Sequence, residues 1–199
     1  MKPWRSVIAL LATVFGGGAQ AAPSEPSMPY IAQGACPFEC CTYREWQARE
    51  DVPAYAEPRD DAIKVTTVKI DGRVTAETGF VVTKAAGVVK VLRNISVGYP
   101  PEARGPNISS ELNLRPGDIL YLLHPLGEGN SLFWYEGKTY IDQILFGEPG
   151  SREMPEPPFR EMSEAKYDWW VKIRTAAGRI LWLKNPPYFR YADACAADP

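Results

Sequence analysis

The stretch that decides the fold runs from Tyr167 to Leu183 and reads YDWWVKIRTAAGRILWL. Its first half alternates between two sides with a period of two residues, which is typical of a β-strand. We predict that one side belongs to the core and that the other side faces solvent. The predicted core side holds Trp169, Val171 and Ile173. The predicted solvent side holds Trp170, Lys172 and Arg174, and burial of the Trp170 ring in the core is the alternative.

The middle of this stretch predicts a tight turn. Thr175-Ala176-Ala177-Gly178 is short, and Gly178 can adopt the positive φ that many turns need. A second strand is predicted from Arg179 to Leu183. The whole stretch is therefore predicted to be a β-hairpin with an apolar face and a mixed face.

A faint copy of this hairpin occurs earlier in the chain. Residues 80–94 read FVVTKAAGVVKVLRN and residues 171–185 read VKIRTAAGRILWLKN, with Ala-Ala-Gly at the same place in both. Internal similarity of this kind predicts two copies of one small β-unit. Coincidence is the alternative, because β-hairpins share a composition.

Composition points to a globular all-β protein. Hydrophobic residues make up 45% of the 199 residues, and 19 Pro, 16 Gly and 12% aromatics favour short strands joined by turns. The formal net charge of −2 becomes −4 without Lys2 and Arg5. This mild acidity argues against a nucleic-acid partner, because nucleic acid selects for a basic face.

The N-terminus has the features of a cleaved targeting segment. Lys2 and Arg5 are followed by an apolar run and by the small-residue site Ala19-Gln20-Ala21. We predict a signal peptide over residues 1–21, a mobile tether over residues 22–35, and a periplasmic or secreted mature chain without a membrane span. The alternative is an anchor that stays attached, but the apolar run is shorter than the roughly 20 residues that a spanning helix needs.

The cysteines agree with export to an oxidising compartment. Cys36, Cys40, Cys41 and Cys195 are even in number and place three thiols early and one late in the chain. We predict a local bridge from Cys36 to either Cys40 or Cys41, with the remaining cysteine bonded to Cys195. A redox or metal role for Cys40-Cys41 is the alternative, but the one histidine, His124, lies far along the chain.

Several of these segments resemble the bacterial SH3-like domains of exported proteins. The matching parts are Pro116-Gly117-Asp118 before a strand, Trp134-Tyr135, residues 170–174, and residues 178–183. Tyr55-Ala56-Glu57-Pro58 and Gly72-Arg73-Val74 resemble the opening of a first copy. Two positions depart from the family pattern, since Leu181 stands in place of a Gly and Val91 in place of a Trp.

The resemblance implies two small SH3-like barrels packed together, with long loops and a disulfide clamp. The first unit is expected over residues 36–98, a linker over 99–111, and the second unit over 112–199. Modules of this family bind peptides, cell-wall fragments or partner proteins, although a fold does not carry a function by itself.

A non-catalytic binding module for cell-wall peptide or a protein partner is therefore the leading hypothesis. Aromatic residues are enriched at recognition sites, and basic neighbours suit an acidic ligand. The candidate ligand-binding residues are Trp134, Tyr135, Trp170, Trp182, Lys172 and Arg174. No cofactor and no metal are expected. The alternatives are a structural or assembly protein of the cell envelope and, less favoured, a hydrolase that pairs His124 with a cysteine or uses two carboxylates.

Overall fold

The computed structural model describes residues 25–98, 112–146, 157–187 and 189–195. Every regular element in these ranges is a β-strand, and the predicted all-β class is confirmed. The predicted signal peptide, residues 1–21, and the predicted linker, residues 99–111, lie outside the described residues.

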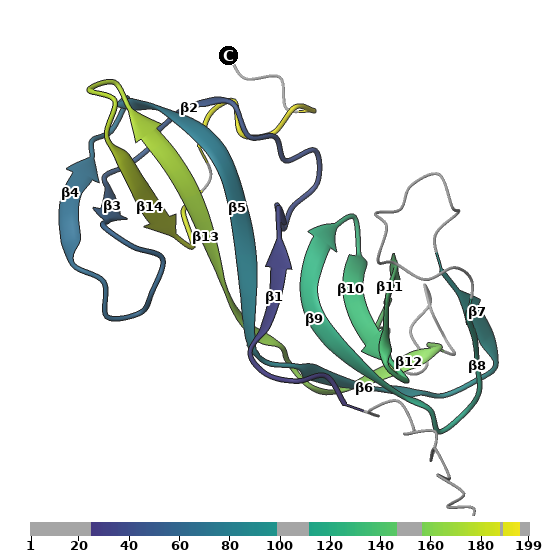
Figure 1. Cartoon of the computed structure of the whole chain (residues 1–199). Helices are drawn as coiled ribbons and strands as arrows, with labels where there is room; N and C mark the ends of the chain where they lie inside the picture. Colours follow the sequence, from purple (N-terminus) through teal and green to yellow (C-terminus); the bar gives the residue numbers. More distant parts are fainter. Residues whose placement is uncertain (1–24, 99–111, 147–156, 188, 196–199) are drawn as a thin grey trace, which may run out of the picture.

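The larger sheet has seven strands and contains the hairpin predicted from residues 167–183. Its strands follow the order β1-β5-β13-β14-β3-β4, and β2 pairs with β5 beside this path (Figure 1). The strands are β1 (Tyr30–Gln33), β2 (Glu45–Gln47), β3 (Val52–Tyr55), β4 (Lys64–Val68), β5 (Arg73–Ala85), β13 (Lys166–Thr175) and β14 (Ile180–Lys184).

The smaller sheet has five strands in the order β11-β10-β9-β6-β12. Two further strands, β7 and β8, form a separate pair at its side (Figure 1). The strands are β6 (Gly87–Val91), β7 (Ile95–Val97), β8 (Leu112–Leu114), β9 (Ile119–Gly127), β10 (Asn130–Tyr135), β11 (Lys138–Gln143) and β12 (Phe159–Ser163).

One long antiparallel ribbon runs through both sheets. Strand β5 continues into β6 across the single residue Ala86, and β12 continues into β13 across residues 164–165. Strand β5 pairs with β13, and β6 pairs with β12. Figure 1 shows both segments of the ribbon bending together from the larger sheet into the smaller one.

The hairpin predicted at residues 80–94 is therefore wrong. Ala85-Ala86-Gly87 makes no turn, because the chain passes straight from one sheet into the next. Gly87 is required here for space. A Cβ at this position would lie 2.8 Å from the backbone nitrogen of Ala165 and 3.0 Å from the carbonyl oxygen of Ser163.

The predicted closed barrels are also wrong. Each sheet is an open path of hydrogen-bonded strands in the described residues, so neither closes on itself. The two sheets also do not separate at residues 99–111, since each takes strands from both sides of that segment. The physical reason is the ribbon, in which β5 continues into β6 and β12 into β13, so that the chain passes between the sheets where a hairpin was predicted at residues 80–94.

Each sheet has its own apolar core. In the larger sheet the predicted core side of β13, with Trp169, Val171 and Ile173, packs against Trp46 and Phe189. In the smaller sheet the buried cluster is Val89, Val91, Val97, Leu114, Leu120, Leu122, Phe133, Tyr140, Ile144 and Phe159. The sheets are joined by a buried hydrogen bond of 2.8 Å, which the Thr83 hydroxyl donates to the carbonyl oxygen of Leu123.

The disulfides confirm the predicted pattern and select one of its two alternatives. Cys36 is bonded to Cys41, and Cys40 is bonded to Cys195 across 155 positions of the sequence. On the chain-entropy view a bridge that closes so long a loop stabilises the fold by about 4–5 kcal/mol. Structural disulfides of this kind indicate a non-cytoplasmic, oxidising compartment.

The segment predicted as a tether is partly ordered. Residues 30–33 form strand β1, which pairs with Phe80–Thr83 along one edge of the larger sheet. The short run Tyr-Ile-Ala-Gln has no decisive periodicity by itself, and its strand conformation is imposed by hydrogen bonding to the exposed edge of β5. The described part of the chain contains no apolar helix of membrane-spanning length.

Candidate ligand-binding site

The structure buries the residue on which the predicted surface depended most. Trp170 has only 2% of its surface exposed, so the prediction that it faces solvent is wrong. The edge of the Tyr55 ring packs against it at 5.9 Å between centroids, and the Lys184 Nζ lies 5.6 Å from its ring centroid. Trp182 is half-buried on the neighbouring strand β14, where it packs edge-on against Phe80 at 5.6 Å.

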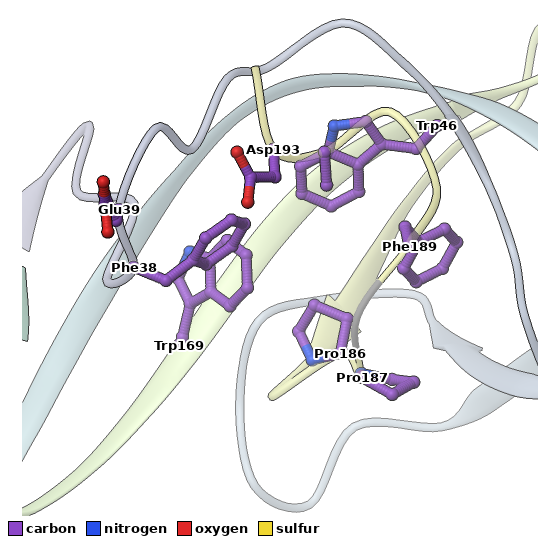
Figure 2. A pocket seen from close by; sticks show the side chains of 9 residues that line it. Phe38, Glu39, Trp46, Trp169, Pro186, Pro187, Phe189 and Asp193 are labelled. Carbon is purple, nitrogen blue, oxygen red and sulfur yellow. The ribbon is translucent and has the colours of Figure 1, made fainter. Parts of the chain in front are cut away.

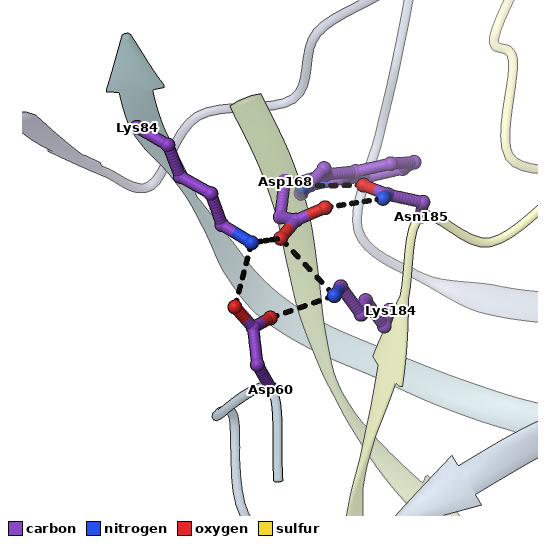
Figure 3. Close-up of polar contacts among 6 residues, drawn as sticks. Asp60, Lys84, Asp168, Lys184 and Asn185 are labelled. Atoms are coloured by element: carbon purple, nitrogen blue, oxygen red, sulfur yellow. Dashed lines mark hydrogen bonds and ion pairs between the residues drawn. The ribbon is translucent and has the colours of Figure 1, made fainter. Parts of the chain in front are cut away.

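A network of charges also covers this face, as Figure 3 shows. Asp60, from the loop between β3 and β4, pairs with Lys84 at 2.6 Å and with Lys184 at 2.7 Å. Asp168 pairs with the same two lysines at 2.5 and 3.1 Å, and Asn185 donates to it at 2.7 Å. The network is balanced, with two carboxylates against two ammonium groups. Through Asp60 it links the loop between β3 and β4 to Lys84 on β5 and to Lys184 on β14.

The pKa directions agree with this structural role. The hydrogen bonds from Lys184 and Lys84 lower the pKa of Asp60 to about 2. Burial by itself would raise the pKa of Asp168, but the hydrogen bonds from Lys84, Asn185 and Lys184 outweigh it and lower the pKa below its ordinary value. Both carboxylates are therefore held in their charged form at neutral pH.

The other predicted basic residues of this face are also paired. Lys172 contacts Glu77 at 3.2 Å, and Arg174 contacts the same carboxylate at 2.6 Å. These two side chains lie together on β13, as predicted, but Glu77 already neutralises part of their charge. An acidic ligand would have to compete with this carboxylate.

Trp134 and Tyr135 lie in the other sheet, on β10. They do not form a continuous strip with Trp170 and Trp182, which belong to β13 and β14. Tyr135 packs against the core of the smaller sheet. Burial, together with the negative charges of Asp118 and Glu136, raises its pKa to about 12.

A different part of the larger sheet holds an aromatic cavity of about 400 Å³. Its volume lies within the range of about 300–1,000 Å³ that is usual for small-ligand sites. Figure 2 shows the side chains around it, which come from the first disulfide loop, from β2 and β13, and from the chain after β14. The cavity is lined by Phe38, Glu39, Trp46, Trp169, Pro186, Pro187, Phe189, Ala192 and Asp193.

The local sequence explains how these walls are assembled. The Cys36–Cys41 bridge fixes the loop that carries Phe38 and Glu39. Pro186-Pro187 ends the last strand, because proline cannot donate to a β-ladder. The Cys40–Cys195 bridge then holds the C-terminal segment beside that loop.

The aromatic walls are packed against one another. Phe38 meets Trp169 edge-on at 5.8 Å between centroids, and Trp46 lies 6.0 Å from Trp169 and 5.4 Å from Phe189. The indole nitrogen of Trp46 donates to the carbonyl oxygen of Thr42 at 2.8 Å, and that of Trp169 donates to the Tyr43 hydroxyl at 3.2 Å. Both indole N–H groups are therefore already used within the protein.

The polar part of the cavity is acidic. Glu39 is exposed at its rim and Asp193 is half-buried. The pKa of Glu39 is raised, and the largest cause is a hydrogen bond with the Glu128 side chain. Desolvation and the negative charges of Glu128 and Asp193 raise this pKa further. Glu128 belongs to the turn between β9 and β10, which lines a neighbouring cavity of about 230 Å³ that also includes Glu39.

None of the cavity residues was among the predicted ligand-binding residues. The available signal was the cysteine pattern, because a bridge between the two ends of the chain must bring the residues around Cys40 and Cys195 together. No sequence pattern showed that the space between them is open.

The structure rules out a pairing of His124 with a free cysteine. All four cysteines of the chain are in disulfides, so His124 has no thiol to activate. His124 itself is buried, its Nδ1 lies 2.9 Å from the Pro125 carbonyl oxygen, and burial lowers its pKa. A carboxylate oxygen of Glu39 and the Sγ atoms of Cys40 and Cys195 lie within 4.8 Å of one another. The two sulfur atoms are bonded to each other, so they supply no thiolate for a metal.

Comparison with known proteins gives no direct guide to the activity. No family model matches the chain, and no curated protein or solved structure matches it at a significant level.

Proposed function

We propose that this chain is a non-catalytic binding module of an exported protein, periplasmic or secreted, and that it binds a peptide or a segment of a partner protein in the aromatic cavity. The observation that carries the proposal is the cavity itself, a preformed space of about 400 Å³ with aromatic walls and two carboxylates. Concave, largely apolar sites with a few polar groups are the usual form of ligand pockets.

The position of the cavity supports the same function. It lies where a disulfide-bonded loop meets a disulfide-bonded C-terminal segment, so its walls are held in place before any ligand arrives. Walls that are already rigid reduce the entropy that binding costs. The previously predicted face around Trp170 is a weaker candidate, because its central ring is buried and its charges are paired among themselves.

A pull-down with the purified chain from residue 22 onward tests this function. The chain is incubated with isolated cell-wall sacculi and, in parallel, is immobilised and exposed to envelope extract. The variant Phe38→Ala removes one aromatic wall of the cavity. We expect the wild-type chain either to bind sacculi or to capture a protein from the extract, and we expect Phe38→Ala to do so less. Glu161→Gln, an exposed change on β12, should behave as wild type.

The outcomes separate the ligand classes. Retention on sacculi favours a cell-wall peptide, whereas a discrete protein from extract that depends on Phe38 favours a protein partner. Retention that is identical in wild type and Phe38→Ala would place binding elsewhere. If the chain binds neither sacculi nor a protein from the extract, the proposed function fails.

A further inference from the structure

The chemistry of the cavity walls restricts what can occupy it. The side-chain donors among the lining residues are the indole N–H groups of Trp46 and Trp169. The Trp46 indole donates to the Thr42 carbonyl oxygen, and the Trp169 indole donates to the Tyr43 hydroxyl. The remaining polar side chains are the carboxylates of Glu39 and Asp193, and ionised carboxylates accept hydrogen bonds without donating them. The Asp193 carboxylate already accepts a hydrogen bond of 2.7 Å from the Cys195 backbone nitrogen. The lining side chains therefore present acceptors and aromatic faces to a ligand.

Negative charge is concentrated at one side of this space. Glu39 lines the aromatic cavity together with Asp193, and it lines the neighbouring cavity together with Glu128. Among the described residues no ion pair includes Glu39 or Glu128. Arg44, a nearby cation, donates to the carbonyl oxygens of Tyr191 and Asp193, so it supports the wall.

This arrangement differs from the charged face around Trp170. There each carboxylate is matched by lysine or arginine, and the network needs no further partner. In the cavity the aromatic rings can attract a cation through their faces, and the Glu39 carboxylate at the rim can neutralise it. The apolar walls can cover an aliphatic stem while the charged end stays at the rim.

We infer that the cavity binds a lysine-type side chain, an aliphatic stem that ends in an ammonium group, on the peptide or partner protein that the module recognises. The inference rests on the proposed function and adds the chemical class of the ligand. The stem lies against Phe38, Trp169 and Pro187, and the ammonium group meets the carboxylate of Glu39 at the rim.

The test uses small probes and the indole signals of Trp46 and Trp169 in a ¹H–¹⁵N spectrum of the purified chain. Nα-acetyl-lysine methylamide is compared with Nα-acetyl-norleucine methylamide, which keeps the stem and lacks the charge, and with Nα-acetyl-glutamate methylamide. We expect the lysine probe to shift both indole signals in a saturable way. The norleucine probe should bind up to about five times more weakly, which corresponds to the upper range for one exposed ion pair.

Variants assign the effect to the cavity. Glu39→Gln removes the rim charge with little change in shape, and we expect it to weaken the lysine probe about fivefold while leaving the norleucine probe unchanged. Phe38→Leu keeps the wall apolar but removes its aromatic face, so it should also weaken the lysine probe more than the norleucine probe. Glu161→Gln is the matched control for loss of an exposed glutamate and should change neither affinity.

Failure of this inference is distinguishable from failure of the proposed function. Equal binding of the lysine and norleucine probes, or binding of the glutamate probe, would overturn the lysine assignment and leave a binding module with a different ligand. If no probe shifts either indole, the assignment is also overturned. The pull-down, which does not depend on the chemical class, would then decide whether the module binds at all.

Discussion

The chain contains the same three residues, Ala-Ala-Gly, at two places where it does opposite things. Ala176-Ala177-Gly178 forms the turn between β13 and β14, with Gly178 at φ 77°. Ala85-Ala86-Gly87 carries the chain straight from β5 into β6. In the first segment glycine supplies a backbone conformation, and in the second it supplies the space left by a missing side chain.

The difference comes from what lies beside each segment. In the turn, the Gly178 nitrogen donates to the Thr175 carbonyl oxygen at 2.8 Å, and a Cβ on Gly178 would meet nothing within 4 Å. Gly87 instead pairs with Leu122 on β9, and the bend between β12 and β13 passes directly over it. Local composition therefore leaves the choice open, and tertiary partners decide it.

The largest expected effect is at the junction between the sheets. Gly87→Ala places a methyl group 2.8 Å from the Ala165 backbone nitrogen, which belongs to the main chain and has little room to move. We expect the free energy of unfolding to fall by about 3 kcal/mol, as for an overpacked core. Urea denaturation with the disulfides intact measures it, and Ala85→Ser, an exposed neighbouring change, is the control. A loss below about 0.5 kcal/mol would show that the close approach is unimportant.

An intermediate effect is expected from the charges that flank the ribbon. Asp168, near the junction, is 7% exposed and contacts Lys84 and Lys184, whereas Glu77, near the turn, is half-buried and pairs with Arg174. We expect Asp168→Asn to cost about 2 kcal/mol at pH 7, because it removes a buried carboxylate and leaves Lys84 and Lys184 to share Asp60 alone. Glu77→Gln should cost under about 1 kcal/mol.

The pH dependence of the Asp168 effect follows from its lowered pKa. A carboxyl whose pKa is lower in the folded state stabilises the fold above its ordinary value and loses that contribution as the pH falls through the folded value. The difference between wild type and Asp168→Asn should therefore shrink on acidification below pH 4. Thermal unfolding at pH 7 and at pH 3 measures it, and a difference that stays constant would contradict the charge-based account.

The smallest expected effect is at the turn. Gly178→Ala forces a side chain into the left-handed region but meets no neighbouring atom, so we expect a loss of about 1 kcal/mol. Gly178→Asn should recover part of this loss, because asparagine tolerates that region better. Urea denaturation of both variants tests the point. Equal losses for Ala and Asn would mean that contacts, and not φ, govern this position.

The sequence predicted those parts of the fold that local chemistry controls. The alternation of Trp169, Val171 and Ile173 identified a core face, and Gly178 marked a real turn. The cysteine spacing identified the bridges to within one alternative. The ribbon could not be predicted in this way, because the pairing of β5 with β13 joins segments about 90 positions apart, and hairpin-like composition does not report it.

The candidate site was less predictable than the fold. Strand alternation places Trp170 opposite Trp169 and so toward the surface, but alternation does not reveal that Tyr55 and Lys184 pack against its outer face. The cavity depends on two disulfides, a pair of prolines and the path of the C-terminal segment. Their combined geometry is a tertiary property that no single motif carries.

The Cys40–Cys195 bridge also determines how the protein responds to mechanical force. A pull applied to the chain before Cys40 and after Cys195 passes through the covalent bond and bypasses both sheets, apart from the edge strand β1. The 155 positions between the two cysteines would extend by about 500 Å if released. With the bond closed they stay folded under tension, so the module keeps its shape under loads that would unzip an unbridged β-sheet.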